Sequence, residues 1–109
     1  MSRQRMTISG ALQQLDKHDQ PFLELFSHGS LVVEMYQPDG IDHQQPHSRD
    51  ELYVVAQGTG WFINGVDRQP VEPGEVLFVP AGVKHRFEDF SDDFATWVMF
   101  YGPEGGEEP

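Results

Sequence analysis

Two stretches of the chain hold side chains of the kinds that bind divalent metal ions in proteins. The first stretch, residues 40–58, holds four of them: His43, Gln45, His47 and Glu51. The second stretch, residues 74–89, adds His85. Two imidazoles and one carboxylate suit Fe(II) and other divalent ions, and such a set leaves coordination positions open for water, substrate or dioxygen. We expect this chemistry if the fold brings the two stretches together.

The spacing of these residues predicts that their side chains converge. On a β-strand, residues two apart point to the same face. That spacing relates the members of one set: His43, Gln45, His47, Glu51, Tyr53 and Val55. His85 shares a face with Phe87 and Asp89 in the same way. A regular strand would therefore aim these histidines and Glu51 into the interior, where a carboxylate is costly unless it is paired or bound to a metal.

The elements that must position these residues are expected to be short strands. Apolar or alternating runs occur at residues 22–26, 31–36, 52–55, 61–63, 76–79, 85–90 and 94–101. Turn residues separate them, and Asn64-Gly65 is the strongest hairpin signal. Ser9 is expected to cap a short helix that extends to Leu15. About seven to nine short strands with little helix predict an all-β sandwich or barrel.

The length of 109 residues allows one domain. We expect an N-terminal segment with the short helix at residues 1–20 and the β domain at residues 21–101. Residues 102–109 form an acidic tail with almost no apolar content, and we expect this tail to be flexible.

Charge and composition disfavour several classes of partner and of metal ligand. The net charge is −11, with seven Lys and Arg against 18 Asp and Glu, which disfavours nucleic acid and anionic membranes as partners. The absence of cysteine excludes disulfides and thiolate ligands. The N-terminus has no apolar segment typical of a secretory signal, and no apolar run approaches the roughly twenty residues of a membrane span. We therefore expect a cytoplasmic protein.

Both stretches resemble the paired motifs of the cupin superfamily. The first motif is usually written G-x5-H-x-H-x3-4-E-x6-G, and three residues fit its later positions: His47, Glu51 and Gly58. The second is G-x5-P-x-G-x2-H-x3-N, and four residues fit it at every spacing: Gly74, Pro80, Gly82 and His85. Asp89 stands where Asn is usual. The resemblance covers residues 31–101 and implies a small single-domain cupin, an antiparallel jelly-roll β-barrel.

The resemblance also implies a ligand set. His47, Glu51 and His85 look like three of the four usual cupin ligands, for one divalent ion per chain: Fe, Mn, Ni or Zn. Gln45 stands where the first histidine of the pair is usual, and Gly40 is one residue closer to it than the motif asks. Gln45 could bind the ion, hydrogen-bond a metal-bound water or hold substrate. His43 could replace it if the strand bends.

The expected function follows from this site. We expect a metal-dependent enzyme acting on a small molecule, with dioxygenase-type chemistry favoured. The alternatives are a metal-assisted isomerase or lyase, or a non-catalytic cupin that binds or senses a small ligand. Four side chains could line the substrate pocket, although aromatic residues on strands commonly form plain core: Tyr53, Phe78, Trp97 and Met99. Small cupins are often homodimers, and the hairpin at residues 22–36 is the expected interface.

Overall fold

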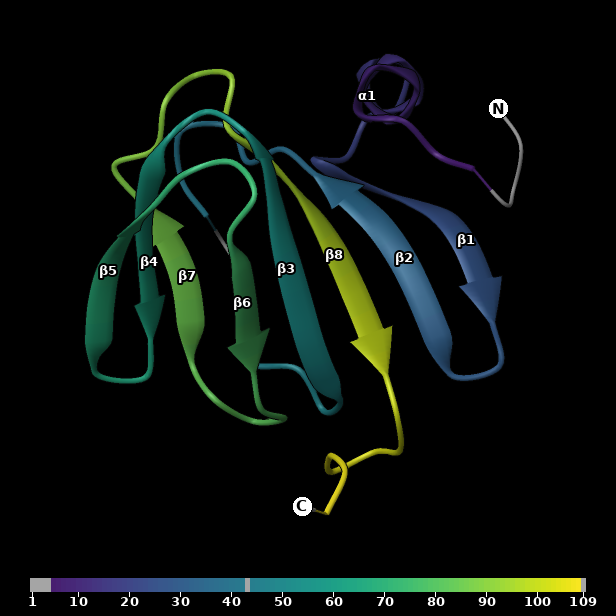
Figure 1. Cartoon of the computed structure of the whole chain (residues 1–109), viewed down its shortest axis with the longest axis vertical. Coiled ribbons are helices and arrows are strands. Elements are labelled where there is room, and N and C mark those ends of the chain that lie inside the picture. Colours follow the sequence, from purple (N-terminus) through teal and green to yellow (C-terminus); the bar gives the residue numbers. More distant parts are fainter. Residues whose placement is uncertain (1–4, 43, 109) are drawn as a thin grey trace.

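The computed structural model describes residues 5–42 and 44–108, which form one helix and two antiparallel sheets (Figure 1). The helix is α1 (Ile8–Asp16). The strands are β1 (Phe22–His28), β2 (Leu31–Tyr36), β3 (Asp50–Gln57), β4 (Gly60–Asn64), β5 (Asp67–Val71), β6 (Val76–Val79), β7 (His85–Glu88) and β8 (Ala95–Tyr101). The larger sheet has the order β1-β2-β8-β3-β6, and the smaller has the order β5-β4-β7. The predicted all-β fold is confirmed.

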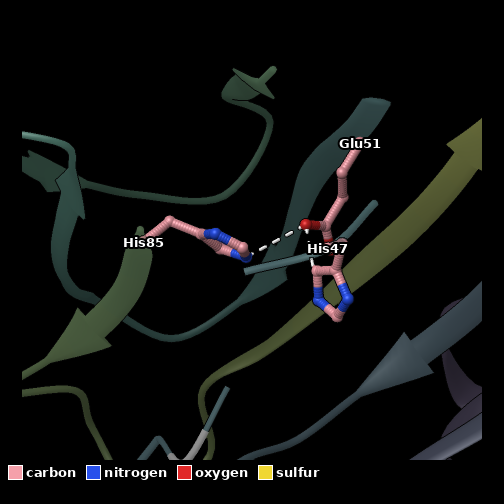
Figure 2. Close-up of side chains that lie close together, drawn as sticks. All are labelled: His47, Glu51 and His85. Atoms are coloured by element: carbon pink, nitrogen blue, oxygen red, sulfur yellow. Dashed lines mark ion pairs between the residues drawn. The ribbon is translucent and has the colours of Figure 1, made fainter. Parts of the chain in front are cut away.

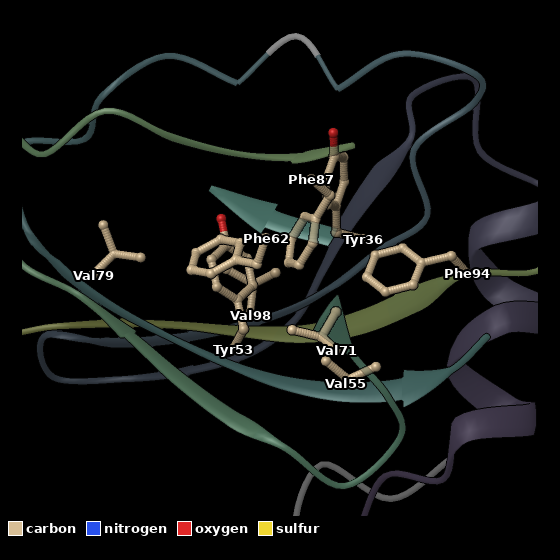
Figure 3. Close-up of a cluster of buried hydrophobic side chains, with 9 residues drawn as sticks. All are labelled: Tyr36, Tyr53, Val55, Phe62, Val71, Val79, Phe87, Phe94 and Val98. Atoms are coloured by element: carbon tan, nitrogen blue, oxygen red, sulfur yellow. The ribbon is translucent and has the colours of Figure 1, made fainter. Parts of the chain in front are cut away.

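The core lies between the two sheets and takes side chains from both (Figure 3). The larger sheet contributes Tyr36, Tyr53, Val55, Val79 and Val98, and the smaller contributes Phe62, Val71 and Phe87, with Phe94 from the loop before β8. The rings of Tyr53, Phe62 and Phe87 pack against one another with centroids 4.9–5.6 Å apart. Alternation along each strand therefore buries one face, as the sequence pattern predicts.

The helix α1 begins two residues earlier than expected. Thr7 is the N-cap, and its hydroxyl accepts a hydrogen bond from the Gly10 amide at 3.0 Å, so Ser9 lies inside the helix and the predicted cap is wrong. Ala11 and Leu15 pack against Met35 on the outer face of the larger sheet. No helix within the described ranges is long and apolar enough to cross a membrane.

The polar strand β5 is the element that the sequence pattern does not reveal. Four of its five residues are exposed, so it lacks apolar alternation. It forms because the hairpin at its start is favourable: Gly65 has a φ of +64° at the first position of a two-residue loop, as a type II′ turn requires.

The segment before β3 departs from the predicted regular strand. Residues 44–48 are not paired as a strand, and β3 begins at Asp50. The Gly82 amide donates a hydrogen bond to the His47 carbonyl at 2.7 Å, which fastens this segment to the turn before β7. The face that each side chain presents therefore cannot be read from strand parity before Asp50.

Asp50 joins three parts of the chain. Its carboxylate accepts hydrogen bonds from the Ala81 amide at 2.9 Å and the Glu107 amide at 2.8 Å. These hydrogen bonds lower the pKa of Asp50 below its ordinary value. A Cβ added at Gly106 would lie 2.9 Å from the carboxylate. The C-terminal tail, expected to be flexible, is thus bound to the start of β3.

We predict that Asp50→Asn lowers the melting temperature at pH 7, because an amide cannot accept from both main-chain donors as well as a carboxylate does. A folded-state pKa below the unfolded value means that the stabilisation is present above about pH 4 and is lost as the pH falls through the lowered pKa. Thermal unfolding from pH 7 to pH 2 should show the two proteins converging at low pH. The exposed Asp92→Asn variant should match the wild type, and a difference between wild type and Asp50→Asn that stays constant with pH would contradict the assignment.

Candidate metal site

Three side chains from separate parts of the chain meet at one point (Figure 2). Glu51 comes from β3, His85 is the first residue of β7 in the other sheet, and His47 precedes β3. Glu51 Oε1 lies 3.0 Å from His85 Nε2 and 3.8 Å from His47 Nε2. One candidate ligand atom from each residue lies within 4.8 Å of the other two, so one ion could contact all three.

The polar atoms of this cluster are buried without hydrogen-bond partners. Glu51 is 1% exposed and His85 is 5% exposed. Both carboxylate oxygens of Glu51 and the Nε2 atoms of both histidines make no hydrogen bond of acceptable geometry. A buried carboxylate in that condition is strongly unfavourable. A divalent cation would satisfy all of these atoms at once, so the residues present fit a metal ion.

The tautomer of His85 is set by its neighbour. Its Nδ1 lies 2.9 Å from the Val83 carbonyl, to which it donates when that nitrogen carries the proton. The lone pair of Nε2 then points at the cluster, which is the arrangement that metal-binding histidines use. His85 would therefore meet an ion with a fixed ring orientation.

The two histidines differ in proton affinity. Burial lowers the pKa of His47 below its ordinary value, with Glu51 opposing and His85 adding to the effect. Burial also acts to lower the pKa of His85, but the Glu51 carboxylate 3.0 Å away and the Val83 carbonyl outweigh it, so the pKa of His85 is raised. A proton on His85 is thus the natural substitute for a cation beside Glu51, and protons compete with metal for this site.

A second polar cluster, which the sequence analysis missed, lies next to the three ligands. The buried carboxylate of Asp42 accepts from the Tyr36 hydroxyl at 2.6 Å, the Phe87 amide at 2.7 Å, and the Gln44 side chain at 2.8 Å. The Tyr53 hydroxyl donates to Gln44 Oε1 at 2.6 Å. Both ends of the Gln44 amide are therefore held. The contact between Asp42 and the Phe87 amide spans 45 residues, so the sequence around Asp42 does not reveal it.

The structure does not place Gln45 with the three ligands. Its side chain is exposed, because the non-strand backbone at residues 44–48 turns Gln44 inward in its place. His43, the proposed substitute, lies outside the described residues. Asp89 is also remote: it has a φ of +49° and pairs with Arg68 at 2.9 Å. Asn and Asp tolerate that backbone conformation best, which explains either residue at this position of the second motif.

A cavity of about 540 Å³ opens onto the cluster. Its walls are formed by Gln20, Pro21, Phe22, Glu34, Tyr36, Ile41, Gln44, His47, Glu51, Val98 and Phe100. Most of this lining is apolar, with a few polar groups, as is usual for small-molecule sites.

Three of the predicted pocket residues lie elsewhere. Phe78 is 46% exposed on the outer face of β6. Trp97 and Met99 share the outer face of β8, where Trp97 packs on the cluster beneath α1. The alternation of β8 instead aims Val98 and Phe100 at the cavity. Tyr53, the fourth predicted residue, is fully buried in the core behind the ligands and reaches the site only through its hydroxyl.

The structure thus combines a β-barrel with an inward His-His-Glu cluster that could hold a metal ion, and comparison with known proteins identifies its family. The family model described as Cupin domain matches residues 32–101. The uncharacterized protein SCO3923 of Streptomyces coelicolor is 35% identical over 89 residues, which cover 80% of this chain and 85% of that protein. The chain therefore belongs to the cupin family, and the resemblance noted from its motifs is confirmed.

Solved structures agree on the fold. A cupin superfamily protein from Desulfitobacterium hafniense superposes with a TM-score of 0.61 at 19% identity, over 73% of this chain and 74% of that one. KdgF from Halomonas sp. superposes with a TM-score of 0.65 at 16% identity, over 73% of this chain and 76% of its own. At these identities the likeness is one of fold alone.

We predict that divalent ions stabilise the protein through this cluster. At a free concentration a hundredfold above its dissociation constant, an ion bound only to the folded state adds about 2.7 kcal/mol, or roughly 10 °C in melting temperature for a domain this size. Differential scanning fluorimetry with Mn²⁺ or Zn²⁺, after chelator treatment, measures the shift.

The Glu51→Gln variant should lose most of that shift while remaining folded, because it removes the charged ligand and also a costly buried charge. The matched control is Glu104→Gln, an exposed carboxylate outside the cluster. An equal shift in wild type and Glu51→Gln would mean that the ions bind somewhere else.

Proposed function

We propose that this cupin is a metal-dependent enzyme that acts on a small molecule in the cavity beside His47, Glu51 and His85. Oxidation by dioxygen is the favoured chemistry. The observation that supports the proposal is the buried, unpartnered carboxylate of Glu51 between two imidazoles, at the inner end of a cavity of small-molecule size. A barrel that served only as a scaffold would gain stability by replacing that carboxylate with an apolar side chain.

The chain's own residues prepare the site in two ways. His85 is oriented by the Val83 carbonyl, and Gln44 is held between Tyr53 and Asp42. Because Gln44 lines the cavity with its amide fixed, it presents a rigid polar wall to whatever binds there. With Fe(II) bound, the site would offer oxidation by dioxygen, whereas a redox-inert ion would offer Lewis-acid assistance to an isomerase or lyase.

The facial arrangement favours oxygen chemistry over the alternatives. Two histidines and one carboxylate would leave several coordination positions of an ion free. Among the described residues that line the cavity, Glu34 is the one carboxylate outside the ligand set that could act as a general base. A non-catalytic cupin that binds or senses a small ligand remains the competing proposal. That proposal predicts that the protein binds a small ligand but does not convert it, whichever metal is supplied.

The test is elemental analysis of protein purified without chelator, beside a His47→Ala, Glu51→Ala double variant. We expect near-stoichiometric Fe, Mn, Ni or Zn in the wild type and at least a tenfold loss in the variant. The His18→Ala, Glu104→Ala variant, with two exposed positions, is the control and should retain the metal. Oxygen uptake by the Fe(II)-loaded protein, against activity with Zn²⁺, then separates the two chemistries. Wild-type protein that holds no metal even after reconstitution would overturn the proposal.

We also propose that two copies pair through the outer face of the larger sheet. The face is apolar in cross-strand rows: Phe78, Leu52 and Met99 in one, and Val76, Val54 and Trp97 in the next. Phe78 and Val76 are 46% and 65% exposed. The expected interface, the hairpin at residues 22–36, has less to offer because Leu23 and Leu25 already pack against α1. In a chain of net charge −11, a charge-free face is where two copies can approach without repulsion.

We predict that Phe78→Asp raises the dimer dissociation constant at least tenfold, because it places a charge on the proposed apolar interface. Light scattering coupled to size-exclusion chromatography across a concentration series measures this. Val66→Asp, at a fully exposed loop position, is the control and should leave the mass unchanged. A wild type that stays monomeric at high concentration would refute the pairing.

A further inference from the structure

The cavity has an unusual charge balance for a site that takes small metabolites. Its ionisable lining residues are Glu34, Tyr36, His47 and Glu51, and none of the residues that line it is a lysine or arginine. The described arginines near the barrel are committed to other groups. Arg68 and Arg86 pair with Glu88, and Arg49 donates to main-chain carbonyls. Among the described residues of the cavity wall, therefore, no side chain supplies a positive charge to a negatively charged ligand. A metal ion held by His47, Glu51 and His85 would supply one.

Glu34 is the polar group at the end of the cavity away from the metal ligands. It comes from β2 and lies directly across from the exposed Glu24 of β1. No lysine, arginine or histidine in the described part of the chain lies within ion-pair distance of Glu34. Burial, with the charges of Glu24 and Glu51, raises its pKa. A partly buried carboxylate without a partner gains from a ligand that brings a hydrogen-bond donor or a positive charge.

The strand order separates Glu34 from Glu51 by one strand. Glu34 is paired with Val98 on β8, and Glu51 with Phe100 on the same strand. Neighbouring strands lie about 4.8 Å apart and each residue rises about 3.4 Å along a strand, so the backbone positions that carry the two carboxylates are about 12 Å apart. Val98 and Phe100 form an apolar floor between them. The cavity thus has two polar ends joined by an apolar middle about as long as a two-ring molecule.

We propose that the cavity selects an uncharged or cationic small molecule with an apolar, ring-sized body, and that Glu34 receives a hydroxyl or ammonium donor of that molecule. The proposal rests on the proposed function in placing the reacting end at His47 and Glu51. Carboxylates and phosphates are disfavoured, because a buried anion beside Glu34 would have no countercharge in the wall.

Three probes of one shape and different charge test the selection: 2-naphthol, 2-naphthoate and 2-naphthylmethylammonium. Their affinities are measured at pH 7.5 by titration of naphthalene fluorescence, with chelator-treated protein and again after metal loading. In the chelator-treated protein we expect naphthol and the ammonium probe to bind at least tenfold more tightly than naphthoate. Equal or tighter binding of naphthoate, or no binding of any probe, would overturn the proposal.

Variants at two positions of the hairpin formed by β1 and β2 test whether Glu34 causes the charge selection. Glu34→Gln should weaken the ammonium probe about five- to tenfold and strengthen naphthoate by a similar factor. Glu24→Gln, directly across the strand pair but outside the cavity lining, should change neither by more than twofold. Glu34→Asp keeps the charge and should keep the ranking, which separates charge from packing. Identical behaviour of Glu34→Gln and Glu24→Gln would also overturn the proposal.

The metalloenzyme proposal and the charge-selection proposal fail in different ways. If the protein binds no metal but still ranks the probes as expected, the metalloenzyme proposal falls and the charge selection stands. If the protein binds metal at His47, Glu51 and His85 but prefers naphthoate when metal-free, the charge selection falls and the metal site stands.

Discussion

The barrel depends on how it accommodates two adjacent carboxylates at the start of β3. Asp50 and Glu51 point to opposite faces, and each engages the segment that carries the second motif. Asp50 holds the Ala81 amide, while Glu51 faces His85 from inside the barrel. One strand start therefore fixes both the turn before β7 and the ligand that follows it. Because the carboxylate of Glu51 is buried without a hydrogen bond, this end of the fold is complete only when a cation or a proton lies beside it.

The sequence is informative at the motif positions. His47, Glu51 and His85 were named from spacing and resemblance, and the structure brings them together. The prediction for Gln45 relied on strand parity in a segment that is not a strand. Trp97 and Met99 were assigned to the pocket by residue type, although alternation along β8 had to place either them or Val98 and Phe100 inside. Strand parity predicts which residues share a face of a strand, but only the tertiary structure shows which face points into the barrel.

Asp42 and Gln44 could not have been found from local pattern. Asp42 binds the Phe87 amide, 45 residues away, and Gln44 binds Tyr53 on another element. Such a cluster depends on which strands become neighbours in the fold. The sequence around Asp42 does not indicate which strands those are. The polar residues near the ligands read from sequence as an ordinary hydrophilic loop, whereas in the fold they form a satisfied network beside an unsatisfied one.

The contrast between the hydrogen-bonded Asp42 network and the unpartnered Glu51 cluster indicates which groups in the cavity are free to bind an ion. The Gln44 amide accepts from the Tyr53 hydroxyl and donates to Asp42, so two hydrogen bonds fix its orientation in the cavity wall. Gln44, and not the predicted Gln45, is the amide that lines the cavity beside His47 and Glu51. An ion held by His47, Glu51 and His85 would keep its remaining coordination positions directed at the cavity. The polar network thus gives the cavity wall beside His47 and Glu51 a fixed arrangement.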